Sequence, residues 1–121
     1  MESSIQRRLA DDGTATVTVI GEIDFSNADD LADCVRDVIT DWSPALIRVD
    51  LRSATFIDST GLGALIEGYR AAIENQARFV VANPSASFRR VLDVTGLCDF
   101  FGLGENPQAN DAAGQAQATG A

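Results

Sequence analysis

Asp58, Ser59 and Thr60 place a carboxylate and two hydroxyls on consecutive residues, directly before Gly61. An apolar strand end at 55–57 precedes them, and an apolar pattern of helical period follows. A helix leaves its first backbone amides without internal partners, and each of these three side chains can accept from such an amide as an N-cap. The same amides and the helix dipole favour an added negative group on a hydroxyl. The turn therefore predicts a helix N-terminus whose hydroxyls are suited to carry a phosphate.

Enzyme chemistry finds little support in the sequence. Histidine is absent, which excludes Ser-His and Cys-His catalysis, phosphohistidine relays and histidine-ligated zinc. Residues 58–61 have one residue more than the Asp-Ser/Thr-Gly turn of aspartic proteases. The Gly-x-Ser-x-Gly elbow of hydrolases and the phosphate-binding loop Gly-x-x-x-x-Gly-Lys-Ser/Thr are both absent. A receiver-type phospho-aspartate at Asp50 would want a lysine, and the chain has none. We therefore expect no catalytic residue, no metal site, no cofactor and no enzyme activity.

Composition restricts the class of partner. The chain has 121 residues, enough for one domain with a single core. Its net charge of -9 argues against direct contact with nucleic acid, which depends on clustered Lys and Arg. No apolar run approaches the about 18 residues that cross a bilayer, and the first residues lack the apolar region of a signal peptide. A cytoplasmic protein without membrane insertion is the expectation.

Cys34 and Cys98 are the two cysteines of the chain, and no Cys-x-x-Cys spacing exists. Two cysteines do not make a disulfide framework, and cytosolic base rates favour two partly buried thiols. Because both are expected near helix ends, a redox-linked pair stays open as an alternative.

Apolar periodicity predicts the order of the elements. The expected strands cover residues 4–9, 14–20, 45–51 and 78–82, with the further strand end at 55–57. The expected helices run from an N-cap at 25–26 to about 40, from the 58–61 turn to about 75, and from 83–85 to a stop at Gly96. A last short strand or turn is expected at 99–103. This order predicts an α/β fold with a mixed four- to five-stranded sheet and helices packed against it.

The second and third helices are each expected to bury one apolar stripe. The stripes consist of Leu62, Leu65, Ile66, Tyr69 and Ile73 in the second helix, and of Phe88, Val91 and Leu92 in the third. A single domain is expected over residues 1–104. Residues 105–121 contain no aromatic residue and no Leu, Ile or Val, so we expect a disordered tail there.

Four segments, in order and at family-like spacing, carry a resemblance to a known family. They are Gly21-Glu22-Ile23-Asp24, Asp50-Leu51 leading into Phe56-Ile57-Asp58-Ser59-Thr60-Gly61-Leu62-Gly63, Val81-Ala82-Asn83-Pro84, and Arg89 to Leu97. Over residues 5–103 the chain resembles the STAS domain (sulphate transporter and anti-sigma factor antagonist). It is similar in particular to the free-standing bacterial anti-sigma factor antagonists.

The resemblance implies a regulatory protein without chemistry of its own. Family members of this kind bind an anti-sigma factor that is also an ATP-binding serine kinase, and so release a sigma factor. The kinase phosphorylates one serine at the start of the second helix, which switches binding off, and a serine phosphatase restores it. The matching position is Ser59, and the neighbouring hydroxyl, serine in many relatives, is Thr60 here. The expected partner-binding residues are Asp24, Asp58, Ser59, Thr60 and Gly61.

Other interpretations of the same residues stay open. Ser59 can act as an N-cap alone, Thr60 can be the phosphoacceptor, and Asp24 can simply solvate a loop. At the level of the whole protein, the alternative is a STAS accessory subunit of an ABC-type transporter or of a stress-sensing assembly.

Overall fold

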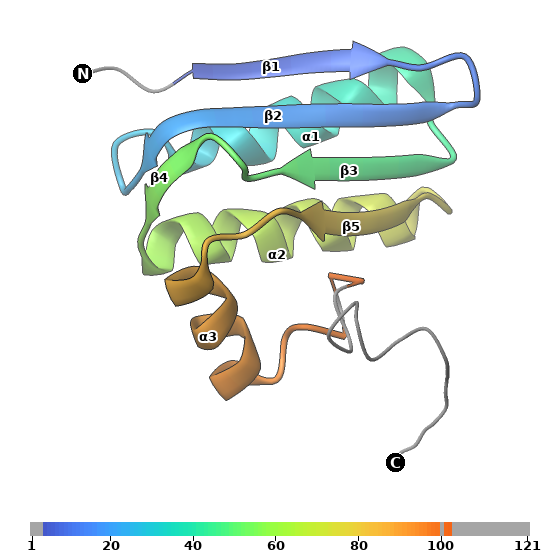
Figure 1. The fold of residues 1–121 in the computed structure, drawn as a ribbon. Helices are drawn as coiled ribbons and strands as arrows, with labels where there is room; N and C mark the ends of the chain where they lie inside the picture. Colours follow the sequence, from blue (N-terminus) through green and yellow to red (C-terminus); the bar gives the residue numbers. More distant parts are fainter. Residues whose placement is uncertain (1–3, 100, 103–121) are drawn as a thin grey trace.

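Five strands and three helices make up the part of the chain that the computed structural model describes, residues 4–99 and 101–102 (Figure 1). In chain order they are β1 (Ser4–Leu9), β2 (Thr14–Ile23), α1 (Ala28–Trp42), β3 (Leu46–Asp50), β4 (Ala54–Ile57), α2 (Ser59–Glu74), β5 (Arg78–Ala82) and α3 (Ala86–Thr95). The predicted α/β class is confirmed, and each predicted helix and each strand predicted before residue 99 has a counterpart.

The sheet is mixed, as expected, and β2 is its central strand. The order is β1-β2-β3-β5, with β1 antiparallel to β2 and the other pairs parallel. β2 has ten residues, so it is long enough to pair with two parallel strands, one after the other, along the same edge. The first half pairs with β3 from Thr14 to Thr18, and the end pairs with β4 from Gly21 to Ile23. β2 therefore extends beyond the predicted end at residue 20.

The strand end predicted at 55–57 is a separate strand, β4, and not a continuation of β3. Asp50 closes β3 because its Oδ1 accepts from the backbone amide of Arg52 at 2.9 Å and from Asn83 Nδ2 at 3.1 Å. The chain then turns, and the Gly21 amide donates to the Ser53 carbonyl at 3.0 Å. These bonds direct β4 away from β3 and toward the far end of β2.

α1 and α2 pack side by side on one face of the sheet, behind it in Figure 1. Alternate residues of the strands face these helices and are buried: Ala15, Val17 and Val19 in β2, Ile47 and Val49 in β3, Phe79 and Val81 in β5. The residues between them, such as Thr16, Thr18 and Arg48, lie on the opposite face. The core thus forms one layer between the sheet and the two helices.

The buried face of α2 differs from the predicted stripe. It consists mainly of small residues, namely Gly61, Ala64, Leu65, Gly68 and Ala72. Of the expected residues only Leu65 is buried, whereas Leu62, Ile66 and Tyr69 are half-buried and Ile73 is exposed. The reason is close packing, since a Cβ on Gly68 would lie 3.2 Å from the Phe79 ring and 3.3 Å from Val35. In α3, Phe88 and Leu92 are buried as expected, but Val91 is exposed.

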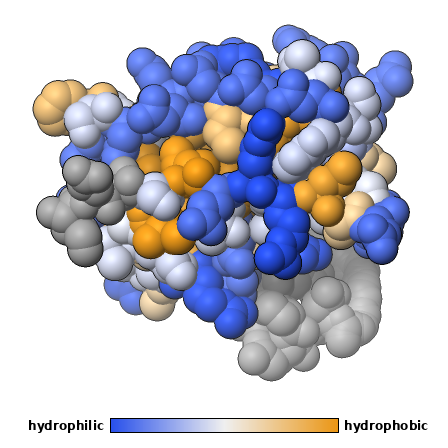
Figure 2. Space-filling view, turned by 90° about the horizontal axis from the view of Figure 1, so that it is seen from above, coloured by the Kyte–Doolittle hydropathy of each residue, from blue (hydrophilic) through white to orange (hydrophobic). Residues whose placement is uncertain are grey.

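The edges of the sheet are protected in different ways. β1 is the outer strand, and Arg7 makes an ion pair with Asp41 at 2.9 Å while its guanidinium lies 4.8 Å from the centre of the Trp42 ring. Seen from the β1 side, the surface is largely hydrophilic and its apolar residues form separate patches (Figure 2). At the β5 edge, the Val81 amide donates to the Phe101 carbonyl at 2.8 Å. Such charges and caps discourage edge-to-edge pairing.

The C-terminal predictions are tested in part. Gly96 ends α3 in a left-handed conformation, with φ of 76°, as predicted. Residues 99, 101 and 102 lie in turns, whereas residues 100 and 103 of the predicted last strand or turn, the boundary at 104 and the expected tail at 105–121 lie outside the described residues. Both cysteines are free thiols, and Cys34 lies in the middle of α1, not near a helix end. Within the described ranges, no helix is long and apolar enough to span a bilayer.

The contact between α2 and the β2–β4 pair predicts the effect of one substitution. A Cβ on Gly61 would lie 2.6 Å from Ile57 Cγ2 and 2.8 Å from Ile23 Cγ2. We expect Gly61→Ala to reduce the free energy of unfolding by about 1–3 kcal/mol, because the added methyl overpacks the core. Urea denaturation measures this loss.

Gly63→Ala, two residues along the same helix, is the matched control. No heavy atom lies within 4 Å of its added Cβ, and alanine favours a helix over glycine by about 0.5–1 kcal/mol. Its stability should therefore rise or stay constant. If both variants lose stability equally, the close approach of α2 to Ile23 and Ile57 is refuted.

Candidate functional site

Two loops meet at one edge of the molecule because the ends of β2 and β4 pair. Ile23 is the register partner of Ile57, and the Asp58 amide donates to the Ile23 carbonyl at 3.2 Å. Asp24 and Asp58 follow directly after these partners, so the structure brings the two predicted aspartates to the same edge. β2 leads there into α1, and β4 leads into α2.

Asp58 is the N-cap of α2. Its Oδ1 accepts from the backbone amides of Thr60 and Gly61 at 2.9 and 3.1 Å, and from the Thr60 hydroxyl at 2.5 Å. The Thr60 hydroxyl, followed by the Gly61 amide, lowers the pKa of the Asp58 carboxyl below its ordinary value of 3.8. Of the three side chains that were candidates for the cap, the carboxylate takes the position, as a charged acceptor at a helix N-terminus should.

Ser59 is the first residue of α2, and it is exposed. Among the residues that the structure describes, its hydroxyl has no hydrogen-bond partner. The interpretation of Ser59 as an N-cap alone is therefore wrong, because Asp58 caps the helix. Thr60 is exposed as well, but its hydroxyl donates to the Asp58 carboxylate. Of the two neighbouring hydroxyls, that of Ser59 is therefore the one without a hydrogen bond to another described residue.

Asp24 organises the loop before α1. Its Oδ1 accepts from the backbone amide and the hydroxyl of Ser26 at 3.0 and 2.6 Å. The Asp24 amide donates to Asn27 Oδ1 at 2.8 Å, and Asn27 Nδ2 donates to the Glu22 carbonyl at 2.9 Å. Asn27, not the predicted 25–26, is the N-cap of α1 by position, but its side chain is used in the loop and makes no cap hydrogen bond. A partner contact of Asp24 stays a prediction.

Gly61 is buried in the first turn of α2, against Ile57 and Ile23. It offers no side chain to a partner, and its role in the structure is to let the helix approach the strands. The contact with a partner that the sequence predicts for Gly61 remains untested.

Two exposed aromatic residues, Phe25 and Phe56, flank this edge, and the sequence analysis did not identify them as site residues. Phe25 is 82% exposed in the loop after Asp24, and Phe56 is 55% exposed in β4. Exposed aromatic side chains beside polar groups are typical of protein interfaces. A sequence signal existed for Phe56, because side chains alternate along a strand and an inward Ile57 places its neighbour outward.

The electrostatics of the edge are acidic. Asp29 and Asp30 occupy the first turn of α1, close in sequence to Asp24, and Asp58 stands on the neighbouring loop. The salt bridges among the described residues are formed by Arg7 and Arg36, and none of them involves these aspartates. Among the residues that the structure describes, no group of three or more His, Cys, Asp or Glu residues is arranged to hold a metal ion.

Fold and site together define a small α/β binding domain that offers an exposed serine at a helix N-terminus between acidic loops. Residues 8–110 match the STAS domain, and the chain belongs to the STAS domain family. The fold and family predicted from the four sequence segments are thereby confirmed.

Three known proteins illustrate the similarity. The anti-sigma-B factor antagonist of Listeria monocytogenes is 28% identical over 101 residues, which cover 84% of this chain and 88% of that protein. A STAS-domain containing protein of Pseudomonas aeruginosa is 32% identical over 76% of this chain and 89% of its own. The crystal structure of an anti-sigma factor antagonist from Mycobacterium paratuberculosis superposes with a TM-score of 0.72, at 30% identity and 83% coverage of both chains.

The cap geometry predicts how stability depends on pH. Asp58→Ala removes three hydrogen bonds to α2, so it should lower the urea midpoint of unfolding at about pH 7. Because the folded-state pKa of Asp58 is lowered, its contribution is fully present above 3.8 and is lost as pH falls through the folded pKa. The difference between wild type and variant should therefore shrink at about pH 2.5.

Ser59→Ala is the control for this experiment, because the Ser59 hydroxyl makes no cap hydrogen bond. Its urea midpoint should equal that of the wild type at both pH values. A difference between wild type and Asp58→Ala that is the same at both pH values would contradict the role of the ionised carboxylate.

Proposed function

We propose that this protein is an anti-sigma factor antagonist whose partner is an anti-sigma factor with ATP-dependent serine kinase activity. Binding of the antagonist would release a sigma factor, and phosphorylation of Ser59 would end that binding. The observation that carries the proposal is the exposed, unbonded hydroxyl of Ser59 on the first turn of α2, in a chain whose relatives bear the name anti-sigma factor antagonist.

The geometry favours a switch that acts at the interface. A phosphate on Ser59 adds about -1.5 to -2 charges at neutral pH. At a helix N-terminus such a charge is stabilising by about 0.3–1 kcal/mol, so the domain stays folded. The new charge stands beside Asp58 and at the same edge as Asp24. Bulk and repulsion in a surface that must dock then prevent association, and a serine phosphatase restores it.

The same edge specifies the chemistry of the partner surface. Phe25 and Phe56 are suited to enter apolar hollows, and the surrounding aspartates are suited to basic groups on the partner. Direct contact with DNA is not part of the proposal, because a chain with a net charge of -9 is repelled by phosphates. The protein acts in the cytoplasm, through its protein partner.

Substitutions at Ser59 test the switch. Incubated with the candidate kinase and ATP, the wild-type protein should gain one phosphate on the peptide that contains Ser59, and Ser59→Ala should gain none, as measured by mass spectrometry. Ser59→Asp should bind the kinase at least about tenfold more weakly than the wild type in calorimetry, because it mimics the added charge. Its melting temperature should stay within about 2 °C, because the helix N-terminus accepts the charge.

Thr60→Ala is the matched control, since it removes the adjacent hydroxyl and should leave phosphorylation intact. Phosphate on Thr60 in the wild-type protein would refute Ser59 as the phosphate acceptor. A large fall in the melting temperature of Ser59→Asp would show that the added charge acts by unfolding the domain and not by preventing docking. Recovery of a transporter ATPase, and of no ATP-binding serine kinase, in a pull-down would favour the accessory-subunit alternative.

A further inference from the structure

The two loops that follow β2 and β4 carry three exposed hydroxyls, those of Ser26, Ser59 and Thr60. The Ser26 hydroxyl donates to the Asp24 carboxylate at 2.6 Å. The Thr60 hydroxyl donates to the Asp58 carboxylate at 2.5 Å. The Ser59 hydroxyl has no hydrogen-bond partner among the described residues. The three hydroxyls are therefore alike in exposure and differ in whether a carboxylate accepts their proton.

The two bonded hydroxyls are held by the same local arrangement. In each loop, one aspartate Oδ1 accepts from both the backbone amide and the hydroxyl of the residue two positions later. The amide distances are 3.0 Å at Ser26 and 2.9 Å at Thr60. An Asp side chain that bonds to the backbone two residues on is a common turn, and here it binds the hydroxyl as well. Ser59 lies only one residue after Asp58, so this arrangement does not include it.

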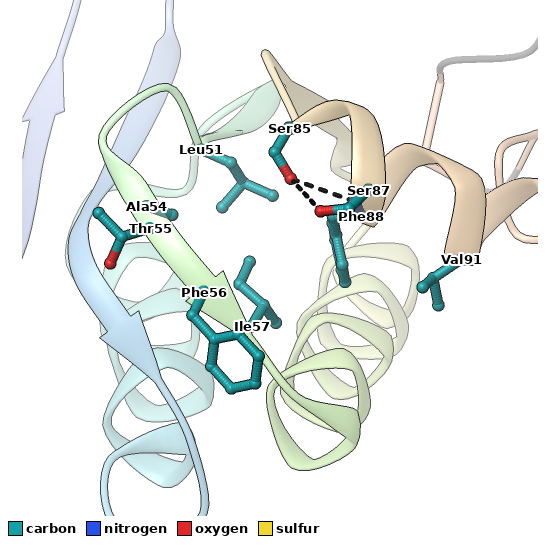
Figure 3. A pocket seen from close by; sticks show the side chains of 9 residues that line it. All are labelled: Leu51, Ala54, Thr55, Phe56, Ile57, Ser85, Ser87, Phe88 and Val91. Carbon is teal, nitrogen blue, oxygen red and sulfur yellow. Dashed lines mark hydrogen bonds between the residues drawn. The ribbon is translucent and has the colours of Figure 1, made fainter.

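The start of α3 has a different cap, at the rim of a hollow that Leu51, Ile57 and Phe88 line (Figure 3). The N-cap there is Ser85, whose hydroxyl accepts from the Phe88 amide at 3.1 Å and lies 3.3 Å from the Ser87 hydroxyl. A serine that caps a helix has its oxygen bonded to a helix amide. A carboxylate cap, as in α2, leaves the hydroxyl of the next residue unbonded.

Phosphoryl transfer from ATP needs a hydroxyl that can give up its proton. The hydroxyl oxygen attacks the γ-phosphorus, the bond from that phosphorus to the bridging oxygen breaks, ADP leaves, and the hydroxyl proton passes to a base of the kinase. Ser59 can donate its proton to such a base directly. Thr60 donates its proton to Asp58 instead, so that hydrogen bond must break before Thr60 can react.

Asp58 is itself unsuited to be the base for Thr60. The Thr60 hydroxyl, followed by the Gly61 amide, lowers the pKa of the Asp58 carboxyl, and a carboxylate of low pKa is a weak base at neutral pH. A phosphate on Thr60 would also replace this hydrogen bond by repulsion between two negative groups. Asp58 therefore disfavours both the transfer to Thr60 and its product.

We propose that Asp58 determines which of the two neighbouring hydroxyls is phosphorylated, because it binds the hydroxyl of residue 60 and leaves that of Ser59 to the kinase. The inference rests on the proposed function, since it requires a serine kinase as the partner, and it deepens that function by naming the residue that sets the site of modification. Asp58 is a positioning residue, because it acts through the hydroxyl that it holds and takes no part in the transfer.

Proteins with serine at both positions test the proposal, because they remove any preference of the kinase for serine over threonine. Each is incubated with the candidate kinase and ATP, and the phosphate is located by mass spectrometry. Thr60→Ser should gain phosphate on Ser59 alone. Adding Asp58→Ala to Thr60→Ser should raise the share of phosphate at position 60 by about tenfold or more. Adding Asp58→Asn is the matched control, and should leave the phosphate on Ser59, because the amide oxygen still accepts the hydroxyl.

The rotamer of residue 60 provides a measurement that does not depend on the kinase. Three-bond NMR couplings of the Thr60 methyl carbon should indicate one χ1 rotamer in the wild-type protein and in Asp58→Asn, and rotamer averaging in Asp58→Ala. A circular dichroism spectrum of each variant shows whether the helices are retained.

The proposal is overturned if Asp58→Ala/Thr60→Ser gains phosphate on Ser59 alone, or on neither residue, since Asp58 would then act only on docking. It is also overturned if Thr60→Ser gains phosphate at position 60 while Asp58 is present, or if Thr60 samples several rotamers in the wild-type protein. Failure of the proposed function has a different signature: the wild-type protein would gain no phosphate on Ser59, while the Thr60 rotamer would still be fixed by Asp58.

Discussion

The parallel pairing of β4 with the end of β2 is the interaction on which the site depends. One hydrogen bond, from the Asp58 amide to the Ile23 carbonyl, joins the two strands at the residue where each loop begins. It fixes the start of α2 and places the Asp24 loop beside it. The close contact of Gly61 with Ile23 and Ile57 then holds the helix against both strands. Without this pairing, the two acidic loops would belong to unrelated parts of the surface.

The N-cap of α2 gives Asp58, Ser59 and Thr60 different roles. A helix N-terminus needs acceptors for its free amides, and a negative side chain meets this need best. Because Asp58 accepts from two amides and from the Thr60 hydroxyl, Ser59 is left without a structural task. A residue with no structural task can be modified without loss of the fold. The cap therefore makes the serine available, and the exposed aromatic residues beside it make its surroundings suitable for docking.

The same pairing has a second consequence on the other edge of β4. A strand that leaves its neighbour β3 in order to reach β2 cannot also be covered by β5, which stays with β3. A hollow remains between β4 and α3, and the apolar residues that line it include Leu51, Ile57 and Phe88. The site at Ser59 and this hollow therefore both result from the pairing of β4 with β2. β4 leads into Ser59 at the start of α2, and residues of β4 line the hollow.

The sequence by itself determined the order of the elements, the class of fold, the family and the position of Ser59 at a helix start, because periodicity, turn residues and local motifs are properties of neighbouring residues. It did not determine that 55–57 pairs with β2, that Asp58 rather than Ser59 caps α2, or that Phe25 is exposed. It also misplaced the buried face of α2, since Gly68 packs against Phe79 and Val35 from distant elements. Those features were decided by the tertiary structure, because pairing, capping and burial depend on which distant residues arrive at the same place.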